Sequence, residues 1–306
     1  MRSLAPIVYF AYNRPVHTRS TLEALSNSVL ADQSALWIYI DGAKANANAE
    51  TLTNIEEVKK IAAEKKWCGE VHIIQAPSNK GLFRSIVDGI TAQVNQFGKV
   101  IVMEDDVLVS QDFLTYMNDA LDLYENDTQV MHISGFSRAE FSAVPIKETT
   151  YFYNHTSCWG WATWKRAWDK FNPDSLAVKK AVSKKGNIKK LNMDNTFEMF
   201  WGLKAIADKK FQSWNTIWHS CVFLNDGFCL HPTKSLVSNI GHDGSGTNCV
   251  PDSQFGQNEL GNEKISLTKI PIVENLEVRA FNVGLHSFKY RFVFLLKHYA
   301  RYLVGY

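Results

Sequence analysis

The chain has 306 residues, of which 45% are hydrophobic and 21% are charged. These values are ordinary for a globular protein and allow one large domain or two small ones. The formal net charge of +2 is too small for a strongly basic nucleic-acid binder, so nucleic acid is not an expected partner. Five cysteines without a CxxC pair, and no run of 18 apolar residues, predict a cytoplasmic protein without disulfides or a membrane span.

Short apolar runs alternate with amphipathic stretches through the first half of the chain. This alternation is typical of the α/β class, in which a mixed, mostly parallel sheet is flanked by helices. The expected strands are 7–11, 36–41, 70–75, 99–103 and 130–134. The expected helices are 18–26, 52–66, 82–97 and one that begins after Ser110, whose side chain can cap it.

The second half differs in composition, because seven of the nine tryptophans lie between positions 159 and 218. The lysine-rich stretch 179–190 is expected to be an exposed loop or the edge of a helix. From Gly241 the sequence reads GHDGSGTN, which is too rich in glycine for a packed element and is typical of a mobile loop.

The two halves are interpreted as one catalytic module. Residues 1–135 are the expected donor-binding half, and residues 136–277 the acceptor-binding half with a mobile loop at 241–249. Residues 278–306 form a separate basic segment at the C-terminal end.

Polar residues follow three of the expected strands. The carboxyl ends of parallel strands open on one edge of a sheet, where ligands usually bind. Glu104, Asp105 and Asp106 form an EDD triplet, and three adjacent acids repel one another. The triplet therefore lies either in a solvated loop or at a cation site. Its position at a strand end favours Mg²⁺ or Mn²⁺ holding a phosphorylated ligand. The strand-end residues are Asn13 and Arg14, then Asp41, then Glu104, Asp105 and Asp106.

Several motifs together resemble a known family. The order NRP, YIDG, NKGLFRSIVDGI and VIVMEDDVLVSQDFLTYM is similar to the donor-binding half of glycosyltransferases with the Rossmann-like GT-A fold. The strongest similarity is to N-acetylglucosaminyltransferase I and the bacterial sugar transferases similar to it, in which the metal motif also reads EDD. SCWGWATWKRAWDKF resembles that family's acceptor-side segment, and SLVSNIGHDGSGTNC resembles the loop that closes on the donor.

The resemblance implies a role for each strand-end residue. Asp106 would be the direct ligand of Mn²⁺ or Mg²⁺. Glu104 and Asp105 would contact sugar or ribose hydroxyls, and Asp41 the nucleoside. The implied donor is a nucleotide sugar, most simply a UDP-sugar such as UDP-N-acetylglucosamine, transferred with inversion at the anomeric carbon. The residues implied to lie near its nucleotide and diphosphate are Asn13, Arg14 and Arg84.

The sequence departs from the family at the catalytic base, which there is an aspartate before a tryptophan in a DDW segment. The comparable tryptophans lie here in QSWNTIW, where Ser213 and Ile217 cannot act as a base. An inverting transfer needs a carboxylate or imidazole near the acceptor hydroxyl. The candidates are Asp243, then Glu198, then His242, although a loop aspartate such as Asp243 often only caps a turn.

Trp159 and Trp161 flank Gly160 and are candidates for stacking on an acceptor sugar, although indole rings more often fill a core. The favoured function is a metal-dependent hexosyl- or N-acetylhexosaminyltransferase of bacterial surface polysaccharide or lipopolysaccharide synthesis, with a glycan or lipid-linked acceptor. A sugar-1-phosphate nucleotidyltransferase is an alternative, but AYNRPVHTRS lacks its glycine-rich signature and lysine. A second alternative is a catalytically inactive module that binds carbohydrate or nucleotide.

The segment 278–306 contains five basic residues and no acidic one. As a helix from Ser287, it would have an apolar stripe with basic residues on the opposite side. A helix docked on the domain and an interfacial helix on an anionic membrane both fit this pattern. The second interpretation predicts a peripheral enzyme on the inner face of the cytoplasmic membrane.

Overall fold

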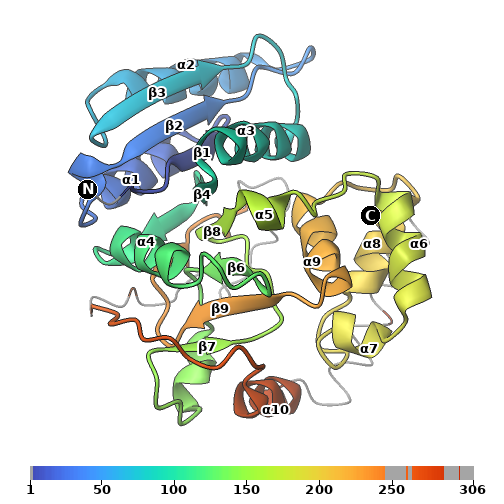
Figure 1. Ribbon diagram of the computed structural model, residues 1–306. Coiled ribbons are helices and arrows are strands. Elements are labelled where there is room, and N and C mark those ends of the chain that lie inside the picture. Colours follow the sequence, from blue (N-terminus) through green and yellow to red (C-terminus); the bar gives the residue numbers. More distant parts are fainter. Residues whose placement is uncertain (1–2, 245–259, 261–263, 286–295, 297–306) are drawn as a thin grey trace.

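One sheet of eight strands runs through the part of the chain that the computed structural model describes, which is residues 3–244, 260, 264–285 and 296. The strands lie in the order β3-β2-β1-β4-β8-β6-β9-β7 (Figure 1). Their bounds are β1 (Ile7–Ala11), β2 (Ala35–Ile40), β3 (Glu70–Gln75), β4 (Lys99–Glu104), β6 (Val130–Ser134), β7 (Thr150–Phe152), β8 (Trp161–Trp164) and β9 (Phe228–Pro232).

Helices follow most of the strands, and local signals explain several of their ends. Pro15 begins the first helix, where its missing N–H costs nothing. The side chain of Asn48 accepts a hydrogen bond from the N–H of Thr51 and so caps the second helix. The helices are α1 (Pro15–Ser26), α2 (Ala49–Ala63), α3 (Leu82–Phe97), α4 (Phe113–Leu123), α5 (Lys165–Trp168), α6 (Ser175–Lys185), α7 (Ile188–Leu191), α8 (Met199–Ala207), α9 (Trp214–Leu224) and α10 (Leu276–Leu285).

The sheet has a hydrophobic core on each face. All of β1 is buried, and its residues alternate between the two cores, with Tyr9 in one and Phe10 in the other. The core that contains Tyr9 is closed by α1, α2 and α4, and the core that contains Phe10 by α3, α5, α6, α8 and α9. This double cover explains why the central strands are almost continuously apolar.

Strands β3, β2, β1 and β4 are parallel neighbours, as the sequence predicted. Strand β8 then pairs antiparallel with both β4 and β6, so the sheet is mixed. A second sheet pairs β5 (Val107–Val109) antiparallel with β10 (Val237–Asn239), which connects the residues after the EDD triplet to a segment 130 positions later. Neither β5 nor β10 was expected.

The predicted cap at Ser110 is wrong. Helix α4 begins at Phe113 with Asp112 at the cap position, and Ser110 contributes its backbone carbonyl, which accepts from the N–H of Phe113 at 3.2 Å. The side chain of Asp112 is used elsewhere, because its Oδ2 accepts from the N–H of Ile265 at 2.7 Å.

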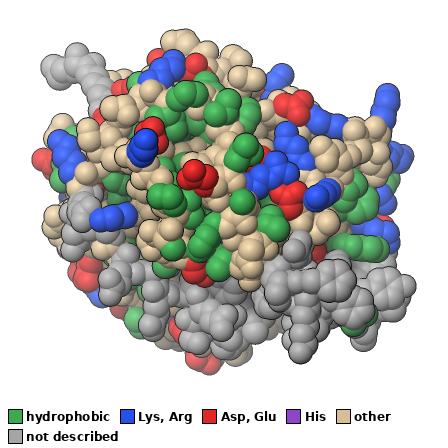
Figure 2. Space-filling view, turned by 90° about the horizontal axis from the view of Figure 1, so that it is seen from below, with side chains coloured by type: hydrophobic (Ala, Val, Ile, Leu, Met, Phe, Trp, Pro, Cys, Tyr) green, Lys and Arg blue, Asp and Glu red, His purple; other side chains and the backbone are tan. Residues whose placement is uncertain are grey.

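The lysine-rich stretch 179–190 forms the end of α6 and most of α7, with Lys180, Lys184, Lys185 and Lys189 exposed. Figure 2 shows Lys and Arg side chains gathered toward the right edge of the face that it draws. The predicted helix from Ser287 and residues 245–249 of the glycine-rich loop lie outside the described residues. In the described part of the chain, no helix is long and apolar enough to span a bilayer.

Candidate active site

The residues that follow β1 and β4 meet at the carboxyl edge of the sheet. The two strands are parallel neighbours with Phe10 opposite Glu104, so the chain leaves both at the same edge. Nη2 of Arg14, just after β1, donates to Oδ1 of Asp105 and, at 3.0 Å, to Oδ2 of Asp106. The structure therefore places Arg14 of the NR pair against Asp105 and Asp106 of the EDD triplet.

The acid triplet carries more negative charge than Arg14 balances. Burial raises the pKa of Glu104, and the nearby carboxylates of Asp106 and Asp105 raise it further. Burial also raises the pKa of Asp105, against the opposing effect of the Arg14 guanidinium. A divalent cation would favour the ionised forms of these acids, whose full charge Arg14 alone does not balance.

The cluster fits a metal ion held mainly by its substrate. Within the described residues, no three or more His, Cys, Asp or Glu side chains are arranged to hold a metal by themselves. One carboxylate is enough where substrate phosphates and water complete the shell, as is usual for Mg²⁺. The side chain of Asp106 is 11% exposed and lies in the turn between β4 and β5, and its role as the metal ligand stays a prediction.

The β5–β10 ribbon brings a second segment, residues 239–243, against the acids. Asn239 pairs with Val107, and the N–H of Ile240 donates to the backbone carbonyl of Asp106 at 2.8 Å. A Cβ atom on Gly241 would lie 2.4 Å from Oδ2 of Asp106, so only glycine allows this approach. The start of the glycine-rich loop is therefore part of the site.

Asp243, the favoured base, lies in this second segment. Its Oδ2 is 3.2 Å from Nε2 of His17, which is on α1 one turn after Arg14, and 48% of its side chain is exposed. The same Nε2 is 3.3 Å from the carbonyl oxygen of Ile240. Asp243 thus belongs to the same cluster as Arg14 and Asp106.

Glu198 lies on a different part of the chain. It precedes α8, in the group of helices that packs with α6 and α9. Burial raises its pKa to about 7, which is suitable for a general base near neutral pH. However, Glu198 is on none of the segments that form the acid cluster, namely α1, the β4–β5 turn and residues 239–243.

The two candidate stacking residues occupy different environments. Trp159 is partly exposed, and its ring makes edge contacts with Phe136 at 4.6 Å and with His242, the neighbour of Asp243, at 5.7 Å between ring centres. Trp161 is 0% exposed and stacks on Trp214 at 5.4 Å. Its ring also stacks on His132 and packs in the core between the sheet and the helices. Trp161 therefore has no ring face for a sugar, and its predicted acceptor contact does not agree with the structure.

Asp41 follows β2 and holds the turn before α3. Its Oδ1 accepts from the N–H groups of Gly42 and Lys80 at 2.9 and 2.8 Å, and its Oδ2 from Asn79 Nδ2 and the Gly81 N–H at 3.0 and 2.9 Å. These four bonds use the usual accepting positions of a carboxylate. The predicted contact of Asp41 with the nucleoside stays a prediction.

The other two donor residues lie at the same edge of the sheet. Asn13 lies two residues after the end of β1 and is partly exposed. Arg84 is in the first turn of α3, with 75% of its side chain exposed and its Nε 3.7 Å from Oδ2 of Asp88. Their contacts with nucleotide and diphosphate also stay predictions.

His17 was not predicted from the sequence as a site residue, and Gly241 was predicted only as the start of a mobile loop. His17 follows Arg14 at a spacing of three, which places two side chains on one face of a helix, so this signal was available. Gly241 had no such signal, because its closeness to Asp106 depends on the pairing of two three-residue strands.

Residues 2–177, more than half of the chain, match the GNT-I family. The chain belongs to this family. It is a glycosyltransferase of the GT-A type, which confirms the predicted resemblance and fold class. No curated protein sequence matches the chain.

Solved structures of glycosyltransferases are among those that resemble the chain. The mannosyltransferase PcManGT from Pyrobaculum calidifontis, in complex with GDP-Man and Mn²⁺, is 12% identical over 73% of this chain and 70% of its own, with a TM-score of 0.40. TarS from S. aureus is 11% identical over 77% of this chain, with a TM-score of 0.41, and the chain spans 36% of it. The galactosyltransferase LgtC is 12% identical over 71% of this chain and 70% of its own, with a TM-score of 0.31.

Proposed function

We propose that this glycosyltransferase uses a divalent metal and a UDP-sugar to glycosylate a glycan or lipid-linked acceptor, with inversion at the anomeric carbon. One observation carries the proposal. Arg14, Asp105 and Asp106 form a charged cluster at the carboxyl edge of the sheet, and the segment that bears Asp243 is packed against it.

The donor would bind with its diphosphate at this cluster. Asp106 would hold Mn²⁺ or Mg²⁺, and the metal would neutralise the charge that develops on the diphosphate as it leaves. Arg14 already lies between the two carboxylates and can offer its remaining N–H groups to a phosphate oxygen. This arrangement supports a nucleoside diphosphate as the leaving group.

Asp243 is the residue that we propose as the base. Its carboxylate would take the proton of the acceptor hydroxyl, whose oxygen forms a bond to the anomeric carbon. The bond from that carbon to the diphosphate oxygen breaks, and its electron pair leaves with UDP. General bases of this kind typically contribute about 10²–10⁴-fold in rate.

A panel of UDP-glucose, UDP-galactose, UDP-N-acetylglucosamine and UDP-N-acetylgalactosamine tests the proposal. With Mn²⁺, at least one donor is expected to raise the thermal midpoint by mass action and to release UDP slowly to water. EDTA should remove both effects. Saturable binding without UDP release would indicate an inactive binding module, and formation of UTP with pyrophosphate would indicate a nucleotidyltransferase.

The acceptor class is a further part of the proposal. A role in bacterial surface polysaccharide or lipopolysaccharide synthesis requires an acceptor that is a glycan or is attached to a lipid. The basic segment 278–306 would hold the enzyme at an anionic bilayer, each basic residue after Gly284 contributing about 1 kcal/mol near the surface. Arg279 is not counted, because it pairs with Asp194 and Glu274. Sedimentation with anionic vesicles at low salt, lost on truncation after Gly284, is the expected result, and a chain that stays in the supernatant contradicts it.

A further inference from the structure

His17 connects α1 to the segment that carries Asp243. Its Nε2 lies 3.3 Å from the carbonyl oxygen of Ile240 and 3.2 Å from Oδ2 of Asp243. The His17 side chain is 12% exposed, whereas that of Asp243 is 48% exposed. An exposed loop carboxylate therefore has a nearly buried partner on a long helix.

The two contacts determine which nitrogen of His17 carries hydrogen. A carbonyl oxygen only accepts hydrogen bonds, and so does an ionised carboxylate. Nε2 of His17 therefore carries the hydrogen, which lies between Ile240 and Asp243. Oδ2 of Asp243 faces this N–H, so the contact sets the direction of the carboxylate relative to α1.

The backbone just before Asp243 is held against Asp106, the predicted metal ligand. The N–H of Ile240 donates to the carbonyl of Asp106, and Gly241 lies against the Asp106 side chain. These contacts hold the chain only as far as Gly241. His17 extends the connection by two residues, to the carboxylate itself.

We propose that His17 is a positioning residue, which orients the carboxylate of Asp243 for proton transfer. This inference rests on the proposed function. Groups that orient metal ligands commonly contribute about 10–100-fold to metal affinity or activity, and we expect an effect of similar size for a group that orients a base. Loss of the His17 N–H should therefore lower the rate of transfer and leave donor binding intact.

The test is UDP release from the best donor of the panel, with Mn²⁺, in four variants. His17→Phe keeps a ring of similar size but removes the N–H, and kcat should fall about 10-fold with KM changed less than about twofold. His17→Gln can place an amide N–H near the position of Nε2 and should recover most of kcat. In Asp243→Asn, which lowers kcat itself, adding His17→Phe should cause no further loss, because His17 acts through Asp243.

A matched control is His72→Phe. His72 is on the outer strand β3, pairs with Glu70 and stacks on Trp37, so the same replacement there should not change kcat. If His17→Phe lowers the thermal midpoint, kcat of this variant is measured below that midpoint and compared with kcat of His17→Gln at equal folded fraction.

Three outcomes contradict the inference. The first is full activity of His17→Phe, and the second is an effect of this variant on donor KM rather than on kcat. The third is a double variant, His17→Phe with Asp243→Asn, whose fold-loss of kcat is the product of the two single losses. A wild-type chain that releases no UDP from any donor contradicts the proposed function, and the inference with it. If the wild type is active and His17→Phe has the same kcat, the inference is contradicted and the proposed function is not.

Discussion

Gly241 lies so close to Asp106 that a Cβ atom on residue 241 would be 2.4 Å from the Asp106 Oδ2 and 3.0 Å from its Cβ and Cγ. The N–H of Gly241 donates to Oδ1 of Asn239 at 2.8 Å, which keeps the turn in this position. The side chain of Asp106, the predicted metal ligand, is therefore packed on one side against the backbone of a glycine. A small displacement of either segment changes where the Asp106 carboxylate points.

Gly241→Ala should reduce Mn²⁺-dependent donor binding without unfolding the protein. The added methyl group must move the Asp106 side chain, and a shift of about 1 Å in a reacting group can cost about 10²-fold in rate. UDP and Mn²⁺ titrations followed by calorimetry measure the effect. Gly284→Ala is the matched control, because a Cβ there meets no atom within 4 Å. If Gly241→Ala binds UDP and Mn²⁺ as the wild type does, the close contact between residue 241 and Asp106 is not needed for binding.

Asp106→Ala should abolish metal-dependent binding of UDP and leave the fold intact. Removing one of three mutually repelling acids relieves the repulsion that raises the pKa of Glu104, so the thermal midpoint in EDTA should not fall. Asp169→Ala, which removes an exposed partner of Lys165, is the control for a lost carboxylate. Turnover that still depends on Mn²⁺ in Asp106→Ala would contradict the assignment of the metal ligand.

The parallel half of the sheet could be predicted because its strands are short apolar runs separated by amphipathic helices. The antiparallel part could not. Strand β8 reads Trp-Ala-Thr-Trp and lies among other tryptophans, so its composition does not distinguish a strand from a helix. Strands β5 and β10 have three residues each, and their pairing depends on contacts between distant parts of the chain.

The candidate site was predictable where it depends on strand ends and not where it depends on long-range packing. Arg14 and the EDD triplet follow adjacent parallel strands, and a general rule places them together. Trp159 and Trp161 look equivalent in the sequence, but Trp161 is in β8 and fully buried, whereas Trp159 precedes the strand. The contact of His17 with Asp243 joins residues 226 positions apart, beyond the reach of any local pattern.

Asp243→Asn should lower kcat for UDP release by about 10²-fold or more and leave donor KM nearly unchanged, because it removes the base but keeps the shape. Glu198→Gln is the competing variant. The Glu198 carboxyl is outside the acid cluster, so this change should affect kcat less than about threefold. A larger loss of kcat in Glu198→Gln than in Asp243→Asn would reverse the assignment of the base.

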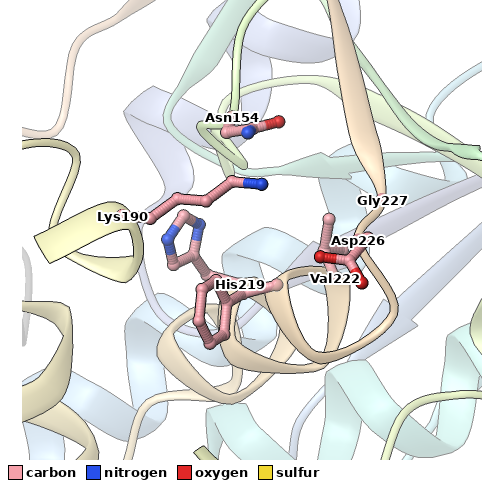
Figure 3. A pocket seen from close by; sticks show the side chains of 7 residues that line it. Asn154, Lys190, His219, Val222, Asp226 and Gly227 are labelled. Atoms are coloured by element: carbon pink, nitrogen blue, oxygen red, sulfur yellow. The ribbon is translucent and has the colours of Figure 1, made fainter. Parts of the chain in front are cut away.

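His219 is a buried histidine outside the candidate active site. It is on α9, is 4% exposed, and its Nε2 lies 3.0 Å from the carbonyl oxygen of Leu191. Figure 3 shows its ring and the ammonium group of Lys190 directed into one hollow. Burial lowers the pKa of His219 to about 4. Burial also lowers the pKa of three further histidines, His132, His155 and His231.

Stability should therefore fall as the pH is lowered from about 6.5 to about 4, because histidine takes up a proton in the unfolded chain before it does so in the fold. For His219 the free energy of unfolding should fall by about 3 kcal/mol over this range. His219→Gln can keep a donor for Leu191 but does not titrate, so its urea-unfolding free energy should depend less steeply on pH. His72→Gln, at a side chain that is 41% exposed, should follow the wild type. Parallel curves for wild type and His219→Gln would mean that His219 is not kept neutral by the fold.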